Sequence, residues 1–333
     1  EKLVGKKLFD ILNSADYRIF NLEGAITDNG KAITKCGPNI KMPTAGIKGM
    51  KALGVDLFAA CNNHILDWGK SGFEDTLDAL DKAKIAHIGG GFTKAEGKKI
   101  HVFEKEGKKI GVYACCEHEF SWFDDYGFGC NGFDDLNTPD EIAEAKKGVD
   151  YLIVLYHGGR EHYRYPFPYL KKRCRKMVDK GADFVICQHT HCVGCKEEYN
   201  GGEIVYGQGN FLFCSDHDDE YWKNGVLAEI TIENDKVSYD FIPFEQDGKG
   251  SIRYSEDKSI LEGFNKRSEE IKDEKFVEKR YAQYADEWSE YYIKRMVEML
   301  DNKTLAVNYI ECEPHRSTLL YALKKTFIEN DKK

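Results

Sequence analysis

The amino-acid sequence of 333 residues predicts an α/β protein. Short apolar runs such as Val55–Ala60, Tyr151–Tyr156 and Phe184–Cys187 are typical of strands buried in a parallel sheet. Segments with the helical spacing of apolar residues lie between them. Each run is followed directly by residues that can bind a metal ion or move a proton. Because ligands bind beyond the carboxyl ends of the strands in open α/β sheets, these residues are candidates for one common site.

The composition is that of a globular protein with a sizeable core, since 41% of the residues are hydrophobic. The formal net charge of −9 argues against general nucleic-acid binding, which needs a basic face. It also gives no help in binding anionic membranes. Because the chain contains no run of about 18 apolar residues, we expect no membrane span.

The eleven cysteines are scattered singly along the chain, and their number is odd. This pattern does not predict the disulfide framework of a small secreted domain. Cys192 and Cys195 form a close pair, but no second pair follows to complete a zinc site. We therefore expect free, mostly buried thiols and a cytoplasmic location.

Helical and extended segments alternate through the first 190 residues. The predicted elements are helix 5–15, strand 17–22, helix 44–53, strand 55–60, a helix ending near 84, strand 86–88, a hairpin of 101–105 with 109–115, helix 139–147, strand 151–156, helix 170–180 and strand 184–187. Residues 89–91 are glycines without the dinucleotide-binding register and predict a tight turn. Residues 117–137 lack any period and predict a long loop. The basic helix 170–180 is interpreted as a solvated outer face.

The last third of the chain changes character. Residues 203–206, 225–232 and 236–244 alternate like antiparallel strands, and the sequence becomes helical and highly charged from about residue 256. The pattern predicts an α/β domain of residues 1–250 and a helical appendage of residues 251–333. The appendage carries no chemical constellation, so its expected role is packing, oligomerisation or shaping of the cleft.

Five side chains at the predicted strand ends form the candidate metal site. They are Glu23, Asn63, His157, His189 and His191. Mixed oxygen and nitrogen donors suit Mn, Fe or Zn better than Mg or Ca. A carboxylate can bridge two such ions, which then clamp the oxygens of an in-line phosphoryl displacement. His64, next to Asn63, is placed to protonate the leaving oxygen, and Asp67 is expected to orient His64 or to cap the following helix.

Each of these residues also has a purely structural interpretation. Glu23 could cap a loop, Asn63 could brace a turn, and a histidine can lie solvated in a loop. The metal site is favoured because the residues occur together at the same topological level of the sheet. Four further side chains are candidates for anion recognition in the cleft, with exposed, solvated side chains as the alternative: His118, Arg160, His162 and Arg164.

Several segments resemble the CapA-type poly-γ-glutamate capsule synthesis family. They are Asn21-Leu22-Glu23, the run from Asn62 to Gly69, His157-Gly158-Gly159-Arg160-Glu161, Gln188-His189-Thr190-His191 and the run from Tyr206 to Phe211. The resemblance implies a calcineurin-like metallophosphoesterase fold, a four-layer α/β/β/α sandwich with a two-metal centre. It also implies that Glu23 bridges, that Asn63, His157 and His189 complete one metal site, that His191 serves the other, and that His64 is the general acid.

One departure from the family pattern concerns the start of the chain. Family members carry an earlier strand ending in Gly-Asp, whose aspartate belongs to the first metal site. This sequence opens with a predicted helix, and Asp10 and Asp16 are poorly placed substitutes. Either that strand precedes this sequence, which implies two ions in the native-length enzyme, or the protein has lost it, which leaves a single ion.

These observations predict a metal-dependent phosphoesterase-like hydrolase associated with capsule or exopolymer synthesis, acting by attack of a metal-bound hydroxide on a small or carbohydrate-linked phosphate. No serine or cysteine nucleophile with a positioned base is evident. The alternatives are a non-catalytic capsule-assembly protein that binds an anionic polymer, and an amide hydrolase or transferase that acts on polyglutamate.

Overall fold

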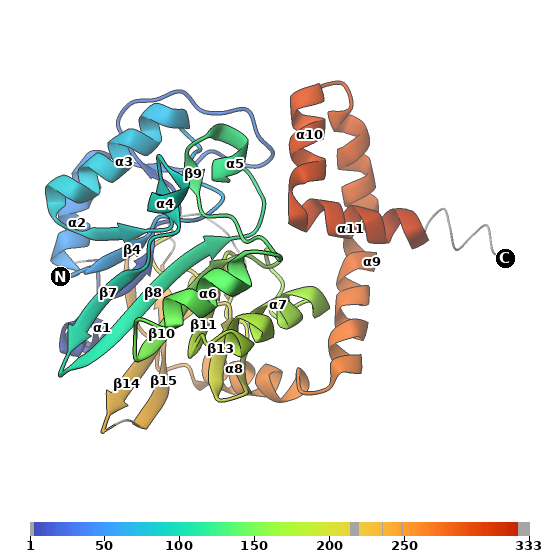
Figure 1. Ribbon diagram of the computed structural model, residues 1–333. Coiled ribbons are helices and arrows are strands. Elements are labelled where there is room, and N and C mark those ends of the chain that lie inside the picture. Colours follow the sequence, from blue (N-terminus) through green and yellow to red (C-terminus); the bar gives the residue numbers. More distant parts are fainter. Residues whose placement is uncertain (1–2, 214–219, 235, 248, 326–333) are drawn as a thin grey trace.

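A computed structural model describes residues 3–213, 220–234, 236–247 and 249–325 and shows a mixed α/β protein (Figure 1). Its main elements fall into three sheets, with helices packed on the outside. The α/β class predicted from the sequence is thereby confirmed.

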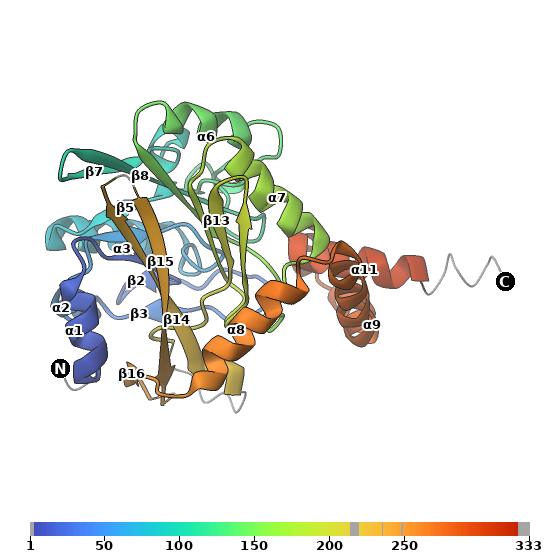
Figure 2. The ribbon, with the colours of Figure 1, turned by 90° about the horizontal axis from the view of Figure 1, so that it is seen from below.

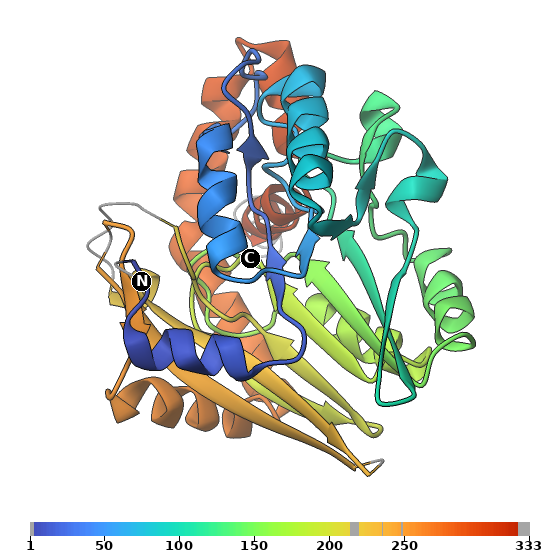
Figure 3. The ribbon, with the colours of Figure 1, turned by 90° about the vertical axis from the view of Figure 1, so that its left-hand side faces the viewer.

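The first sheet is small and fully parallel, in the order β1-β4-β5. Its strands are β1 (Ile19–Asn21), β4 (Leu57–Ala59) and β5 (Ala86–Ile88), and the helices between them are α2 (Ile47–Ala52) and α3 (Gly69–Ala83). Helix α1 (Lys6–Ser14) precedes β1 and contacts β16 (Ile252–Tyr254) of the third sheet. Helix α3 buries Phe73 and Leu80 completely. These apolar side chains recur at helical spacing, so one face of the helix covers the core and the charged face meets water. Helix α3 lies beside α2 (Figure 3).

The second sheet has six strands in the order β12-β13-β11-β10-β8-β7. They are β7 (His101–Lys105), β8 (Lys108–Cys116), β10 (Tyr151–His157), β11 (Phe184–Gln188), β12 (Lys196–Tyr199) and β13 (Gly202–Tyr206). The four central strands are parallel, and the two edge strands are antiparallel. In the register, His157 lies opposite Cys116 on one side and Gln188 on the other. Three strand ends therefore stop at the same level.

Helices α6 (Thr138–Lys146) and α7 (Pro168–Asp179) pack on one face of the six-stranded sheet (Figure 1). A buried apolar cluster that includes Tyr156, Met177 and Val185 fills the space between them. The opposite face meets a second cluster, which joins the six-stranded sheet to the first and third sheets. Because both faces of the six-stranded sheet are buried, its central strands are apolar almost throughout.

The third sheet is antiparallel, in the order β14-β15-β16 (β14 Asn224–Glu233, β15 Lys236–Gln246, β16 Ile252–Tyr254). A cavity of about 1510 Å³ lies between β14 and β1 and is lined by apolar side chains such as Phe20, Ile153 and Ile230. Within the described ranges, β1 pairs only with β4, and β14 pairs only with β15, so each is an edge strand of its sheet. At one end the cavity reaches Glu23 and His191.

The C-terminal part is helical, as predicted, and consists of α8 (Lys258–Glu270), α9 (Glu274–Met299), α10 (Lys303–Glu311) and α11 (Glu313–Leu323). Helix α8 runs along the sheets, and α9 to α11 form a separate pack beside them (Figures 1 and 2). That pack has its own apolar cluster around Tyr292, Met299 and Tyr309. The domain division at residue 250 stays a prediction, although β16 and α8 pack on the α/β part.

Three local expectations differ from the structure. Helix α7 is not simply a solvated face, because Lys171 and Arg173 are buried and bonded to the C-terminal helices. Strand β13 is antiparallel only to β12 and runs parallel to β11. Gly90–Gly91 is a short strand, β6, paired with β9 (Gly129–Cys130), rather than only a turn. Local residue patterns cannot show which strand a segment will pair with, so these errors concern long-range partners.

The remaining elements are short. They are β2 (Ala25–Ile26), β3 (Lys41–Met42), η1 (Thr44–Gly46), α4 (Lys94–Gly97), α5 (Phe123–Tyr126) and η2 (Glu220–Lys223). Within the part of the chain that the structure describes, no helix has both the length and the apolar character needed to cross a bilayer. No disulfide joins the ten cysteines of that part, and all ten are buried.

Candidate metal centre

Four of the five predicted metal ligands converge where β1, β4, β10 and β11 end. The Nε2 atom of His157 lies 3.0 Å from Oδ1 of Asn63 and 3.8 Å from Oε1 of Glu23. Ligand atoms of Glu23, His157 and His189 all lie within 4.8 Å of one another. Two sheets thus place a carboxylate, an amide oxygen and two imidazoles around one point, as the strand-end argument predicts.

The fifth predicted ligand, His191, lies on the other side of Glu23. Its Nε2 atom is 3.5 Å from Oε1 of Glu23, and its Nδ1 atom is bonded to Oδ1 of Asn210 at 2.8 Å. Asn210 also donates to the backbone oxygens of His191 and Trp222. The amide is therefore locked by its neighbours, so His191 donates from Nδ1 and keeps Nε2 for a ligand on the Glu23 side.

The donor set fits a divalent transition metal. Oε1 of Glu23 and Nδ1 of His189 are buried and have no hydrogen-bond partner among the described residues. Buried polar atoms are normally satisfied, so orphaned atoms on two of the converging residues indicate a ligand site. One carboxylate, one amide oxygen and two imidazoles match the ligand types that Mn, Fe and Zn accept.

His64 and Asp67 form the pair that the sequence predicts. Nδ1 of His64 lies 2.7 Å from Oδ2 of Asp67, and both side chains are buried. The ammonium of Lys35, which the sequence did not indicate, lies 2.6 Å from Oδ1 of Asp67 and 3.0 Å from Nδ1 of His64. Asp67 also accepts the amide proton of Ile40. Asp67 is thus bonded through both oxygens and orients His64 through Nδ1, which leaves Nε2 out of this contact.

Burial and neighbouring charge set the protonation of the two central imidazoles. Burial, reinforced by the positive charge on His189, lowers the pKa of His157, so this ring stays neutral and able to bind a metal. Burial also opposes the charge of His189, but the carboxylate of Glu119 outweighs it and raises the pKa of His189 to about 10. Burial raises the pKa of Glu117 to about 7.

Glu117 and Glu119 belong to the site although the sequence pattern did not indicate them. Glu119 Oε1 lies 3.1 Å from Nε2 of His189, and Glu117 Oε1 accepts the amide proton of Gly159 at 2.8 Å. Both come directly after β8, which ends at the same level as β10. The sequence signal that could have identified them is the end of β8, a fifth strand end that is followed by acidic residues. The pattern of residues 101–115 predicts a hairpin, however, and the lack of a period in residues 117–137 predicts a loop for the two acids beyond its second strand.

Two of the predicted cleft residues are engaged in other contacts. Arg160 is buried, contrary to the exposed alternative: its guanidinium lies 4.0 Å from the centre of the Phe167 ring and donates to Gly159 O and Ser317 Oγ. His118 is bonded through Nε2 to Asp125 and through Nδ1 to the backbone oxygen of Glu311. Both side chains hold the C-terminal helices to the core.

The other two lie nearer to the solvent. His162 is exposed, adopts a positive φ of 59° and stacks on Trp222 with ring centres 5.7 Å apart. Arg164 donates to the backbone oxygen of Val193 and lies over the Tyr221 ring. Their part in anion recognition stays a prediction.

The aspartates considered as substitutes for the missing ligand lie elsewhere. Asp10 is exposed in α1 and pairs with Lys6, while Asp16 pairs with Lys105. Neither contacts Glu23 or His191. Among the described residues, one full donor set therefore lies on the His157 side of Glu23, and only His191 lies on the other side.

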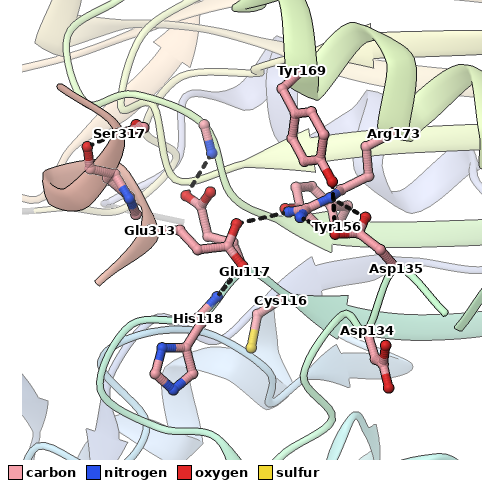
Figure 4. A network of polar contacts seen from close by, with 12 residues as sticks. Cys116, Glu117, His118, Asp134, Asp135, Tyr156, Tyr169, Arg173, Glu313 and Ser317 are labelled. Carbon is pink, nitrogen blue, oxygen red and sulfur yellow. Dashed lines mark hydrogen bonds and ion pairs between the residues drawn. The ribbon is translucent and has the colours of Figure 1, made fainter. Parts of the chain in front are cut away.

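A network of buried charges joins the site to the C-terminal helices (Figure 4). Arg173 of α7 donates to the hydroxyl of Tyr156 at 2.6 Å and to Glu313 of α11 at 3.0 Å. The backbone amide of Glu313 donates to the oxygen of His118. Helix α11 is thereby attached to the middle of the Glu117–Glu119 segment, at His118.

The loop after His191 is held close to β13. A Cβ atom on Gly194 would lie 1.7 Å from the backbone oxygen of Tyr206, where no atom can fit. Gly194→Ala is therefore expected to displace this loop and to destabilise the protein by about 1–3 kcal/mol, the usual cost of overpacking. Urea unfolding would measure the change, with Gly148→Ala as the control, because a Cβ there would meet only one atom, at 3.9 Å. Equal stabilities of the two variants would contradict the expectation.

The arrangement defines an α/β protein with a buried centre suited to a transition metal, and comparison with known proteins gives its family. Residues 2–215 match the family described as "Bacterial capsule synthesis protein PGA_cap". The chain belongs to this family, as the resemblance predicted.

Individual relatives agree. The chain is 29% identical to "PGA biosynthesis protein CapA" of Bacillus subtilis over 61% of this chain and 54% of that protein. It is 26% identical to "Capsule biosynthesis protein CapA" of Bacillus anthracis over 70% of this chain and 58% of that protein. A "Probable polyglutamine synthesis accessory protein" of Mycobacterium tuberculosis is 26% identical over 62% and 58% of the two chains. The chain thus spans just over half the length of these relatives.

Among solved structures, a hypothetical protein from Thermus thermophilus matches 72% of this chain and 92% of its own, with a TM-score of 0.42 and 15% identity.

Proposed function

We propose that this member of the capsule synthesis family is a metal-dependent hydrolase of phosphoric esters. The observation that carries the proposal is the meeting of Glu23, Asn63, His157 and His189 at one buried point, with Oε1 of Glu23 and Nδ1 of His189 unsatisfied. The implied fold is the four-layer sandwich of the calcineurin-like phosphoesterases, and the sheets and helices of this chain are consistent with it. Because one donor set is complete, we expect one ion per chain.

In such a reaction, different residues of the chain would have different roles. The four donors would hold Mn, Fe or Zn, and the bound cation would polarise a phosphate oxygen and lower the pKa of a nearby water. Glu23, which lies between the His157 and His191 sides, is placed to serve a second cation if further ligands are supplied. His191 would bind on that side through Nε2.

His64 is proposed to give a proton to the leaving oxygen. Asp67 holds its Nδ1 atom, and Lys35 neutralises the carboxylate, so the ring is fixed with Nε2 available. Positioned proton transfer typically contributes 10²–10⁴-fold to a rate. Asp67 acts through His64 and has no separate contact with the four donors.

Hydrolysis of an aryl phosphate with added Mn²⁺ tests this proposal. We expect turnover by the wild type and a loss of about 10²–10⁴-fold in kcat for His64→Ala, because the leaving oxygen loses its proton donor. His87→Ala is the control, since His87 lies on β5 and pairs with the exposed Asp81. Turnover that persists in His64→Ala would contradict the assigned role, and a metal-loaded wild type without turnover would contradict the phosphoesterase.

The names of two relatives, which refer to PGA and capsule biosynthesis, favour a second candidate, a protein that binds or processes an anionic polymer such as polyglutamate. It is either a non-catalytic capsule-assembly protein or an amide hydrolase or transferase. The formal net charge of −9 weighs against binding a polyanion broadly. Incubation with poly-γ-glutamate separates the cases: shortened chains indicate amide hydrolysis, and retention without cleavage indicates binding. The cytoplasmic location and an oligomer through the C-terminal helices stay predictions.

A further inference from the structure

The Glu117–Glu119 segment crosses the carboxyl ends of the strands that carry the central histidines. It leaves β8 at Cys116, whose register partner on β10 is His157. Glu117 and Glu119 are only 3% and 7% exposed, although both are carboxylates. Buried acids need partners, and each of these has one at the site: the amide of Gly159 for Glu117 and Nε2 of His189 for Glu119.

The contact of Glu119 concerns Nε2, one of the two ring nitrogens of His189. Nε2 of His189 lies 3.1 Å from Oε1 of Glu119, whereas Nδ1 is buried without a partner among the described residues. A carboxylate only accepts, so Nε2 must carry a proton, and Nδ1 is the atom that can bind a cation once the cation displaces any proton there. In proteins such an outer partner commonly fixes the tautomer and the ring orientation of a metal-binding histidine.

The backbone of His189 supports a constrained role. Its φ of 94° lies in the left-handed region, which a bulky residue rarely adopts. Such strain persists only where surrounding contacts hold it, and it clusters at functional sites. The Glu119 contact is one side-chain interaction that holds this ring in place.

His191 shows the same arrangement with a different partner. Its Nδ1 atom is bonded to the neutral amide of Asn210, which leaves Nε2 facing Glu23. The two histidines therefore present opposite nitrogens, and each is set by a separate outer residue. Only the His189 side has a charged partner.

We propose that Glu119 is the positioning residue of this centre, which accepts the Nε2 proton of His189 and so presents Nδ1 to the metal ion. The proposal rests on the proposed metal site and names a residue that the family motifs do not include. In this arrangement Oε1 of Glu119 is engaged by the imidazole of His189.

Two measurements test the proposal on the full chain. The first is an NMR spectrum of the metal-free protein with labelled histidine, in which the Nε2 proton of His189 is expected as a protected signal. Glu119→Ala should abolish this signal, and Glu119→Gln should keep it, because the amide oxygen still accepts. The second is Mn²⁺ affinity by competition with a chelator, which should fall about 10–100-fold in Glu119→Ala and less in Glu119→Gln.

Glu203→Gln is the matched control, since Glu203 is an equally buried glutamate that pairs with Lys196 on the distant β12. It should change neither the signal nor the affinity. A wild type that binds Mn²⁺ only as tightly as Glu119→Ala would overturn the positioning role and leave the metal site standing. A wild type with the protected signal but no Mn²⁺ binding would overturn the metal site itself and reduce Glu119 to a structural partner.

Discussion

Replacement of His157 by alanine is expected to abolish tight binding of a transition metal. His157 supplies one of four converging donors, and its Nε2 atom lies within 4 Å of both Asn63 and Glu23. Without it, three donors remain, and the Glu23 carboxylate faces an enlarged, wetter space. The loss should exceed the roughly 10–100-fold that removal of an outer partner costs. Metal content after desalting of Mn²⁺-loaded protein would measure it.

The control for this variant is His101→Ala. His101 lies on the edge strand β7 and is bonded to the hydroxyl of Tyr17, far from the four donors. It should retain one ion per chain. Retention of the ion by His157→Ala, with unfolding curves that show an intact protein, would exclude the proposed centre.

Replacement of Arg173 by alanine is expected to be strongly destabilising. The guanidinium is buried, bonded to Tyr156, Asp135 and Glu313, and lies over the Phe133 ring. Its removal leaves an unpaired carboxylate on Glu313, whose side chain is 18% exposed, and an unsatisfied hydroxyl on the buried Tyr156. Breaking a buried ion pair in this way costs about 3–5 kcal/mol. The midpoint and slope of urea unfolding would measure the loss.

Arg295→Ala provides a matched comparison, because Arg295 lies on α9 and pairs with Glu298 at the surface. Exposed pairs of this kind contribute about 0.2–1 kcal/mol. Comparable losses for the two arginines would show that α11 is not held by the buried network. A loss in Arg173→Ala without any change in metal affinity would show that the network stabilises the protein but does not act on the site.

Much of the candidate site could be predicted because strand ends are visible in a sequence. An apolar run that is followed by His157 or by His189 marks both the strand and its functional end. Parallel pairing then places these ends together without further information. The predicted ligands Glu23 and Asn63 follow by the same argument from β1 and β4.

The outer partners could not be predicted in this way. Lys35 lies in an irregular stretch and reaches Asp67 only because the chain folds back. Glu119 comes after a strand whose pairing with β10 spans a long sequence separation. The burial of Arg173 depends on α11, about 140 residues later, so a basic helix face was indistinguishable from a solvated one.

The distribution of the four donors over two sheets has a consequence for folding. Glu23 and Asn63 come after strands of the small parallel sheet, whereas His157 and His189 belong to strand ends of the large one. Strand β1, at the edge of the small sheet, borders the cavity of about 1510 Å³ and is only partly buried, whereas β4 is buried. An ion at this point would connect the small parallel sheet to the six-stranded sheet, and its binding free energy would add to the stability of the folded protein.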